Sequence, residues 1–263
     1  MADRYTSLIG LELDAPVADV GALVRAAIEA GDLDRAAPVR DEGAVAQEVN
    51  WGGRMQKAVV RHFSDVDPLL LRTETYVGAD GIVQGLQRQA GLLEVLARRL
   101  DVSVLAVRDV SAMATWGTAW MHRVAIGVVE HADAIATRVE GEGTWWVRTH
   151  GAARFDVPDL ELYGLHRDQV EPATALLAHV HTQLLDRGLR GQLALGDGTP
   201  IHLVPVLEAW EDLPLDWPGI GRAGRDRGEG LDGPRATVSI LHRPRFGRYR
   251  KDFDGVLAAL SDA

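Results

Sequence analysis

The sequence of 263 residues contains no cysteine, and only two of its 28 basic residues are lysines. Without cysteine the chain forms no disulfide, offers no thiol nucleophile and has no thiolate-ligated zinc site. Its longest notable apolar run, residues 124–129, is far shorter than the roughly 20 residues that a membrane-spanning helix needs. The first 20 residues carry four acids and lack the apolar stretch of a signal peptide. We therefore expect a cytoplasmic protein that does not enter the membrane.

Basic residues are also too few to balance the acids. The chain has 28 Lys and Arg against 38 Asp and Glu, which gives a formal net charge of −10. A chain of this overall sign repels nucleic acid unless its basic residues are concentrated in one segment. The 46% hydrophobic and 25% charged residues are typical of globular proteins and exclude a disordered, collagenous or fibrous chain. At this length we expect one large domain or two small ones.

Hydrophobic periodicity predicts groups of consecutive strands with long helices after them. Alternating or short apolar runs predict strands over 5–13, 45–51, 55–63, 69–77, 103–107, 122–129, 134–139, 144–150, 159–163, 192–195, 201–206 and 236–241. Helical spacing predicts helices over 20–30, 82–100, 113–120, 165–187 and 253–260. This order predicts an α+β fold, in which mainly antiparallel sheets are covered by amphipathic helices.

The two halves of the chain have a similar order of predicted elements. This similarity suggests two meander-plus-helix units, residues 1–110 and 111–263, or one continuous domain. Two pairs of short segments are similar in sequence. Residues 70–74 match 146–150, and residues 92–95 match 176–179. Short matches of leucine and arginine also arise by chance, so the sequence leaves both duplication and coincidence open.

Motifs of the common catalytic and cofactor sites are weak or absent. Residues 219–224 fit Gly-x-Gly-x-x-Gly, but they follow Trp217-Pro218 and precede a glycine-rich stretch instead of joining a strand to a helix. His179 and His181 lie two residues apart on a predicted helix, so they point to different sides and do not bind one metal ion together. No Gly-x-Ser-x-Gly element occurs. We expect no cofactor and no metal, and we favour a protein without catalytic activity.

The most distinctive segment is residues 144–161, Thr-Trp-Trp-Val-Arg-Thr-His-Gly-Ala-Ala-Arg-Phe-Asp-Val-Pro-Asp-Leu-Glu. Continued to Leu185, it resembles uncharacterised bacterial domain families of unknown function. In these families a Trp/Leu-rich strand runs into Thr-His-Gly or Thr-x-Gly, followed by an aromatic residue, Pro-Asp or Pro-Glu and a short strand. The resemblance implies a bacterial α+β protein and assigns no catalytic residue. The preference for arginine over lysine, typical of GC-rich bacterial genomes, points the same way.

Four side chains of this segment form the first candidate site, and they are Arg148, His150, Arg154 and Glu161. Guanidinium groups bind carboxylates and phosphates, and an imidazole titrates near neutral pH, so the group suits anion binding or acid–base chemistry. The structural alternative is that Arg148 pairs with Glu161 across neighbouring strands while His150 caps the strand end. We favour the structural alternative.

Residues 221–251 form the second candidate surface, because nine of them are basic and three are acidic, which leaves −16 for the rest of the chain. Arg245, Arg248 and Arg250 stand beside Phe246 and Tyr249, a mixture that suits nucleic acid or an acidic partner. The alternative is that the basic segment lies on the chain's own acidic body. We favour this intramolecular alternative.

Three functions stay open at this point. We favour an interaction protein of the bacterial cytoplasm, such as an immunity or accessory protein, whose acidic body attracts a basic protein partner. The second is an enzyme or anion-binding protein built on Arg148, His150 and Arg154, and the third is a nucleic-acid binder that uses residues 221–251. The sequence carries no signal for the substrate, the identity of the partner or the oligomeric state.

Overall fold

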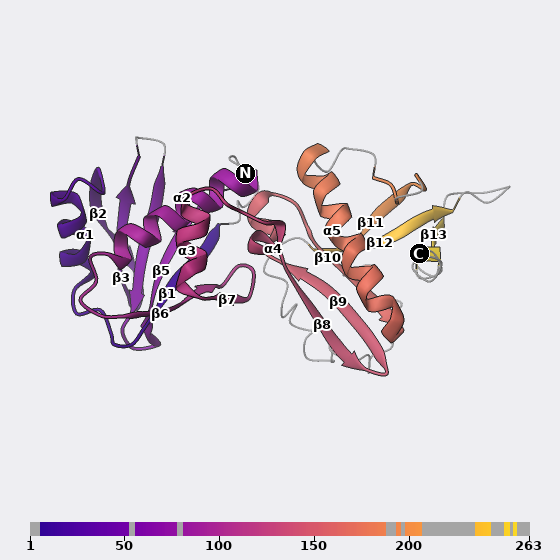
Figure 1. Cartoon of the computed structure of the whole chain (residues 1–263), viewed down its shortest axis with the longest axis horizontal. Helices are drawn as coiled ribbons and strands as arrows, with labels where there is room; N and C mark the ends of the chain where they lie inside the picture. The colour runs from indigo at the N-terminus through magenta and orange to yellow at the C-terminus, as the bar shows by residue number, and fades with distance from the viewer. Residues whose placement is uncertain are drawn as a thin grey trace. The chain divides into compact units, whose positions relative to one another are not determined.

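The computed structural model of the chain describes residues 6–52, 56–77, 81–187, 193–195, 198–206, 235–242, 250–252 and 255–256. The chain divides into two compact units between Ala134 and Ile135. We expected a boundary near residue 110, but helices α3 (Thr118–Ala125) and α4 (His131–Ala134) pack on α2 (Gly81–Ala97) of the first unit. Each unit combines a largely antiparallel sheet with helices, so the predicted α+β class is confirmed (Figure 1).

The first unit is built on a seven-stranded sheet whose neighbouring strands all run antiparallel. In spatial order the strands are β2 (Arg35–Asp41), β3 (Ala44–Asn50), β4 (Lys57–Phe63), β5 (Asp67–Thr75), β1 (Ser7–Leu13), β6 (Val104–Asp109) and β7 (Ala114–Trp116). The meander β3–β4–β5 is the one that the sequence predicts. Strand β2 was not predicted, because it is an edge strand with Pro38 and three charged residues and lacks apolar alternation.

Helices α1 (Val20–Glu29), α2 and α3 form a layer on one face of this sheet (Figure 1). The carboxylate of Asp19 caps α1 by accepting a hydrogen bond from the Ala22 amide at 2.9 Å. Buried apolar residues recur at helical spacing: Val20, Leu23, Val24 and Ala27 in α1, and Leu86, Leu92, Leu93 and Leu96 in α2. Burying each large apolar side chain contributes about 1.5–3 kcal/mol, so this interface supplies much of the unit's stability.

Residues 113–129 differ from the prediction of a short helix followed by a strand over 122–129. The chain instead forms the short strand β7 and then α3. Alternating Val124, Ile126 and Val128 favour a strand locally. In the folded unit, however, Trp120, Met121 and Val124 are buried in the helix that packs on α2, and the Trp120 ring stacks on Trp116. Tertiary packing therefore overrides the local preference.

The second unit has a six-stranded sheet, in which the pair β10–β12 is parallel and the other pairs are antiparallel. In spatial order its strands are β11 (Ile201–Pro205), β12 (Arg235–His242), β10 (Asp159–Leu165), β9 (Thr144–His150) and β8 (Ala136–Glu142), with β13 (Arg250–Asp252) beside β12. Helix α5 (Val170–Arg187) packs on β9 and β10. It begins later than predicted, because β10 extends to Leu165 and a 3-10 turn, Arg167–Gln169, follows.

Both units contain a three-stranded meander followed by a long helix, α2 in the first and α5 in the second. The match of 70–74 with 146–150 is wrong in position, because β5 is the third strand of its meander and β9 is the second. The sheets also continue differently: β6 pairs antiparallel with β1, whereas β12 pairs parallel with β10. Duplication therefore stays a hypothesis that these two segments do not support.

Candidate functional site

The first group of predicted site residues comes together around the end of β9. Glu161 of β10 is opposite Arg148 of β9, and His150 is the last residue of β9. Gly151, with φ of 107°, turns the chain into the short 3-10 helix Ala152–Phe155, which contains Arg154. The connection is fixed because the amide of Leu160 donates to Thr149 Oγ1 at 2.8 Å. The Thr-His-Gly sequence therefore builds a tight strand connection.

These side chains are almost inaccessible to solvent. The exposed fraction is 4% for His150, 1% for Arg154 and 0% for Glu161. Arg148 differs from the expectation in its ion-pair partner. Its Nη2 donates to Glu140 Oε1 of β8 at 2.7 Å, and its guanidinium lies 4.4 Å from the centre of the Trp146 ring. The expected Arg148–Glu161 ion pair is thus replaced by a pair with the strand on the other side. A substrate does not reach His150 in this arrangement, which favours a structural role for the cluster.

The second candidate surface lies largely outside the described residues. This holds for Arg245 and Arg248, for the Gly-x-Gly-x-x-Gly segment 219–224 and for most of the expected helix over 253–260. Arg250 begins β13, and its side chain is outside the description as well. The basic-segment hypothesis therefore stays a prediction.

The sequence reasoning missed a row of arginines on the open face of the first sheet. Arg61 of β4 is opposite Arg72 of β5, and Gly10 of β1 is opposite both Arg72 and Arg108 of β6. Side chains alternate along a strand, and the neighbouring Ile9 is buried on the helix-covered face. The three arginines therefore point away from the helix layer. Within the described part of the first unit, no helix covers this face.

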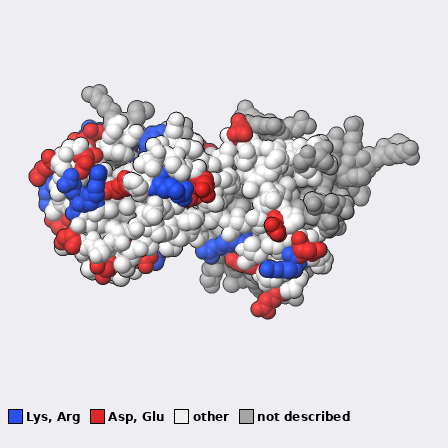
Figure 2. Space-filling view, viewed as in Figure 1, with Lys and Arg blue, Asp and Glu red and all other residues white. Residues whose placement is uncertain are grey.

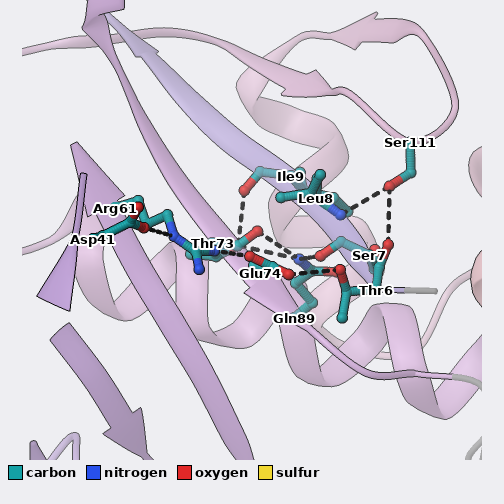
Figure 3. A network of polar contacts seen from close by, with 10 residues as sticks. All are labelled: Thr6, Ser7, Leu8, Ile9, Asp41, Arg61, Thr73, Glu74, Gln89 and Ser111. Atoms are coloured by element: carbon teal, nitrogen blue, oxygen red, sulfur yellow. Dashed lines mark hydrogen bonds and ion pairs between the residues drawn. The ribbon is translucent and has the colours of Figure 1, made fainter. Parts of the chain in front are cut away.

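Carboxylates of the same sheet hold each arginine in place. Arg61 pairs with Asp41 of β2 and Glu74 of β5, and Glu74 also accepts from Thr6 Oγ1 at 2.8 Å (Figure 3). Arg72 Nη2 lies 2.8 Å from Asp67, while Arg108 lies 3.2 Å from Glu12 and 3.8 Å from Asp67. We call seven residues the charged ladder: Glu12, Asp41, Arg61, Asp67, Arg72, Glu74 and Arg108. Their side chains are between 22% and 44% exposed, so a partner can reach them.

Neutral polar contacts hold the helix-covered face at the same place in the sheet (Figure 3). Gln89 of α2 is fully buried, and its Nε2 donates to Ser7 O at 3.0 Å, Thr73 O at 3.2 Å and Thr73 Oγ1 at 3.1 Å. Thr73 Oγ1 donates in turn to Ile9 O at 2.7 Å. Sliding α2 along the sheet would leave these buried groups unsatisfied, at about 1–3 kcal/mol each. The contacts of Gln89 therefore hold β1 and β5, two of the strands that carry the ladder, in position against α2.

A further charged group joins α3 to α4 in the first unit. Both carboxylate oxygens of Asp133 accept hydrogen bonds from Arg123, at 2.8 and 2.6 Å. Trp120 Nε1 and the amide of Glu130 also donate to this carboxylate, at 2.9 and 2.7 Å. Burial alone would raise the pKa of Asp133, but these donors and the Arg123 charge together hold it below its ordinary value. With its acceptor sites occupied by protein groups, Asp133 serves the fold.

Comparison with known proteins identifies no relative: no family model, no curated protein and no solved structure matches the chain. Among the described residues, no three His, Asp or Glu side chains are placed to hold a metal ion. In the same part of the chain, no helix is both long and apolar enough to cross a bilayer. The charged ladder is partly exposed, and its side chains are held by ion pairs. We therefore base the functional proposal on the ladder.

Proposed function

We propose that the chain is an interaction protein whose charged ladder binds a basic segment of a protein partner. One observation carries the proposal: four carboxylates are held in fixed positions by three arginines on an open sheet face. Ordering a flexible side chain on binding costs about 0.5–1.5 kcal/mol, and the ion pairs have already ordered these. The narrower form of the proposal is an immunity or accessory protein of the bacterial cytoplasm.

The ladder's carboxylates have room for a second cation. An ionised carboxylate offers about four acceptor positions, and an arginine fills at most two of them. A guanidinium or ammonium group of the partner would bind beside the arginines already present. Arg61, Arg72 and Arg108 would in turn meet acidic groups of the partner, which adds specificity to the contact.

The charge of the first unit favours a basic partner. Residues 1–134 contain 19 acids and 13 basic residues, an excess of negative charge that attracts cations over a distance. In the view of Figure 2, Lys and Arg alternate with Asp and Glu over the first unit, so that view offers no broad patch of one sign. The ladder itself combines four carboxylates with three arginines, so recognition would depend on the positions of its charges and only secondarily on net charge.

The test uses the full chain and an amidated, fluorescein-labelled nona-arginine peptide as the basic probe. The wild type should bind the peptide, and added salt should weaken the binding. The variant Glu12→Gln/Asp67→Asn/Glu74→Gln removes three ladder carboxylates and should lose at least about tenfold in affinity, since three contacts of about 0.5 kcal/mol each sum to that factor.

A matched variant separates the ladder from net charge. Glu29→Gln/Glu42→Gln/Asp101→Asn also removes three negative charges, but from exposed positions outside the ladder. It should stay within about threefold of the wild type, because long-range attraction alone is screened by salt. Equal losses in the two variants, or no binding by the wild type, would refute the proposal. Binding of heparin in place of the peptide would favour the basic segment 221–251 and a nucleic-acid partner.

A further inference from the structure

The sheet of the second unit ends on a long strand edge. Strand β8 is the last strand in the order β11–β12–β10–β9–β8, and no described strand pairs with its outer side (Figure 1). It has seven residues, of which Thr137, Arg138 and Val139 are exposed. An edge strand directs half of its backbone N–H and C=O groups outward, where another strand can pair with them. The ladder lies in the first unit, so what binds this edge is a separate question from the proposed function.

The other described sheet edges carry features that oppose such pairing. Strand β2 contains Pro38, which has no N–H to donate. Strand β11 ends in Pro205, and its Ile201 amide already donates to the Leu193 carbonyl at 3.0 Å. Strands β7 and β13 have only three residues each. Proline and short length are common protections of a sheet edge, and β8 has neither.

The sequence of β8 is complementary to itself in one antiparallel register. When two copies pair about Val139, this residue is opposite itself, and Arg138 is opposite Glu140 of the second copy. Pairing about Arg138 would place two guanidinium groups opposite each other, and pairing about Glu140 would place two carboxylates so. Like charges directly opposite each other destabilise a strand pair, whereas opposite charges stabilise it. Charge therefore selects the register about Val139.

The existing contacts of β8 are compatible with this register. Val139 is 41% exposed and lies opposite Val147 of β9, which is fully buried. A second copy would extend this apolar row across the axis and remove the exposed part of Val139 from water. Glu140 accepts from Arg148 Nη2 at 2.7 Å, and an ionised carboxylate offers about four acceptor positions. Pairing of the two strands therefore does not require this ion pair to break.

We propose that the chain forms a symmetric dimer in which β8 pairs with β8 of a second copy, antiparallel and in register about Val139. The sheets of the two second units then join into one continuous sheet. Backbone hydrogen bonds hold the strands together, and the side chains of Arg138, Val139 and Glu140 set the register. Pairing of two strands buries less surface than a standard protein interface, so the dimer is weak and depends on concentration.

Sedimentation velocity of the full chain between about 5 and about 500 µM tests the proposal. The mass should rise with concentration from 28.5 kDa towards twice that value, with a dissociation constant of about 100 µM or lower. Val139→Glu should weaken the dimer at least about tenfold, because it places two carboxylates opposite each other at the axis. Val45→Glu adds the same charge at an exposed valine of β3 and should have no effect. A monomeric wild type at the highest concentration, or equal association of the two variants, would overturn the proposal.

A charge pair at the axis provides a gain-of-function test of the same register. Val139→Lys alone should weaken the dimer as Val139→Glu does, because two ammonium groups then meet. An equimolar mixture of the two variants should associate at least as tightly as the wild type, since each pair then combines opposite charges. A mixture that associates no better than either variant alone would overturn the register about Val139.

The lack of cysteine in the chain permits a direct test of proximity. In Val139→Cys, any disulfide joins the thiols of two copies, and facing Cβ atoms of paired strands lie within reach of such a bond. Oxidation with diamide should cross-link this variant at least about tenfold faster than Val45→Cys at the same concentration. The substitution is small and partly exposed, so the variant should fold even if Val139→Glu does not. Equal cross-linking rates of the two cysteine variants would contradict the proposal.

Discussion

The two faces of the first sheet carry polar groups of different kinds. On the helix-covered face, Gln89 and Thr73 are buried and neutral, and backbone carbonyls bind them. On the open face, the charged ladder is partly exposed and its members bind one another. Losing a partner for a buried polar group costs about 1–3 kcal/mol, whereas an exposed ion pair contributes about 0–1 kcal/mol. The buried face therefore determines stability, and the open face is free to serve binding.

The second unit sharpens this comparison, because its charged residues Arg154 and Glu161 are buried. If burial decides the role of a polar residue, these buried charges should contribute to stability, as Gln89 does, and the ladder should not. The expected effects of substitutions then follow burial more closely than charge. They are largest for the buried charges of the second unit and smallest for the ladder.

Arg154→Ala should give the largest loss, about 3–5 kcal/mol in the free energy of unfolding. The substitution empties the volume of a fully buried side chain and removes a buried charge. Chemical denaturation followed by tryptophan fluorescence measures the loss. Arg148→Ala is the matched control in the same segment and should cost about 1 kcal/mol, because its pair with Glu140 is partly exposed. Similar losses for the two variants would break the link between burial and stability.

Asp133→Asn should come next, with a loss of about 2–3 kcal/mol, because charged hydrogen bonds to Arg123 are lost. The pKa of Asp133 is lowered in the folded protein, so its stabilising effect is present above the ordinary carboxyl pKa of about 4. The effect disappears as the pH falls through the lowered value. Unfolding curves below about pH 4 should therefore show a shallower pH dependence for Asp133→Asn than for the wild type. Parallel pH curves would contradict the assignment.

Gln89→Leu should cost about 1–3 kcal/mol, since it keeps the volume but leaves buried carbonyl groups without their donor. Hydrogen exchange should show faster opening of the β1–β5 pair. Gln84→Leu, at an exposed position of the same helix, provides the control and should change stability by less than about 0.5 kcal/mol. If both variants are equally stable, the contacts of Gln89 do not fix the sheet.

The smallest effect should come from the ladder itself. A double-mutant cycle with Arg61→Ala and Glu74→Ala should give a coupling energy of about 0–1 kcal/mol in the free energy of unfolding. Thermal unfolding of the wild type, the two single variants and the double variant, measured at low and at high salt, gives this coupling energy. A coupling of several kcal/mol would mean that the ladder is part of the stabilising framework, and would remove the distinction between the two faces.

The sequence predicted elements whose apolar pattern is local. The β3–β4–β5 meander, the α2 helix and β9 were predicted because apolar residues recur at the spacing of each element, mainly Leu and Val in the meander and in α2, and Trp and Val in β9. Strand β2 and helix α3 were missed or wrongly assigned, because β2 is an exposed edge and α3 depends on contacts with α2. The residues of these two segments do not by themselves indicate a strand at β2 or a helix at α3.

The candidate site was harder to predict than the fold. The density of charge around His150 pointed to a site, but local sequence does not show that the cluster is buried. The ladder left only a weak signal, the alternation of Arg72 and Glu74 with other residues in β5. Its convergence depends on the strand order β4–β5–β1–β6, which pairs residues far apart in the chain. Long-range pairing of this kind is not encoded in any short pattern.

Labelling of carboxylates tests most directly the claim that the ladder is the binding surface and the cluster around Glu161 is structural. The folded full chain is treated with a carbodiimide and glycine ethyl ester, with and without the nona-arginine peptide, and labelled residues are read by mass spectrometry. We predict that Glu12, Asp67 and Glu74 are labelled in the free protein and protected by the peptide. The exposed Glu42 should be labelled in both samples. The buried Glu161 should be labelled in neither sample. Labelling of Glu161 in the folded protein, or ladder carboxylates that the peptide does not protect, would contradict the account.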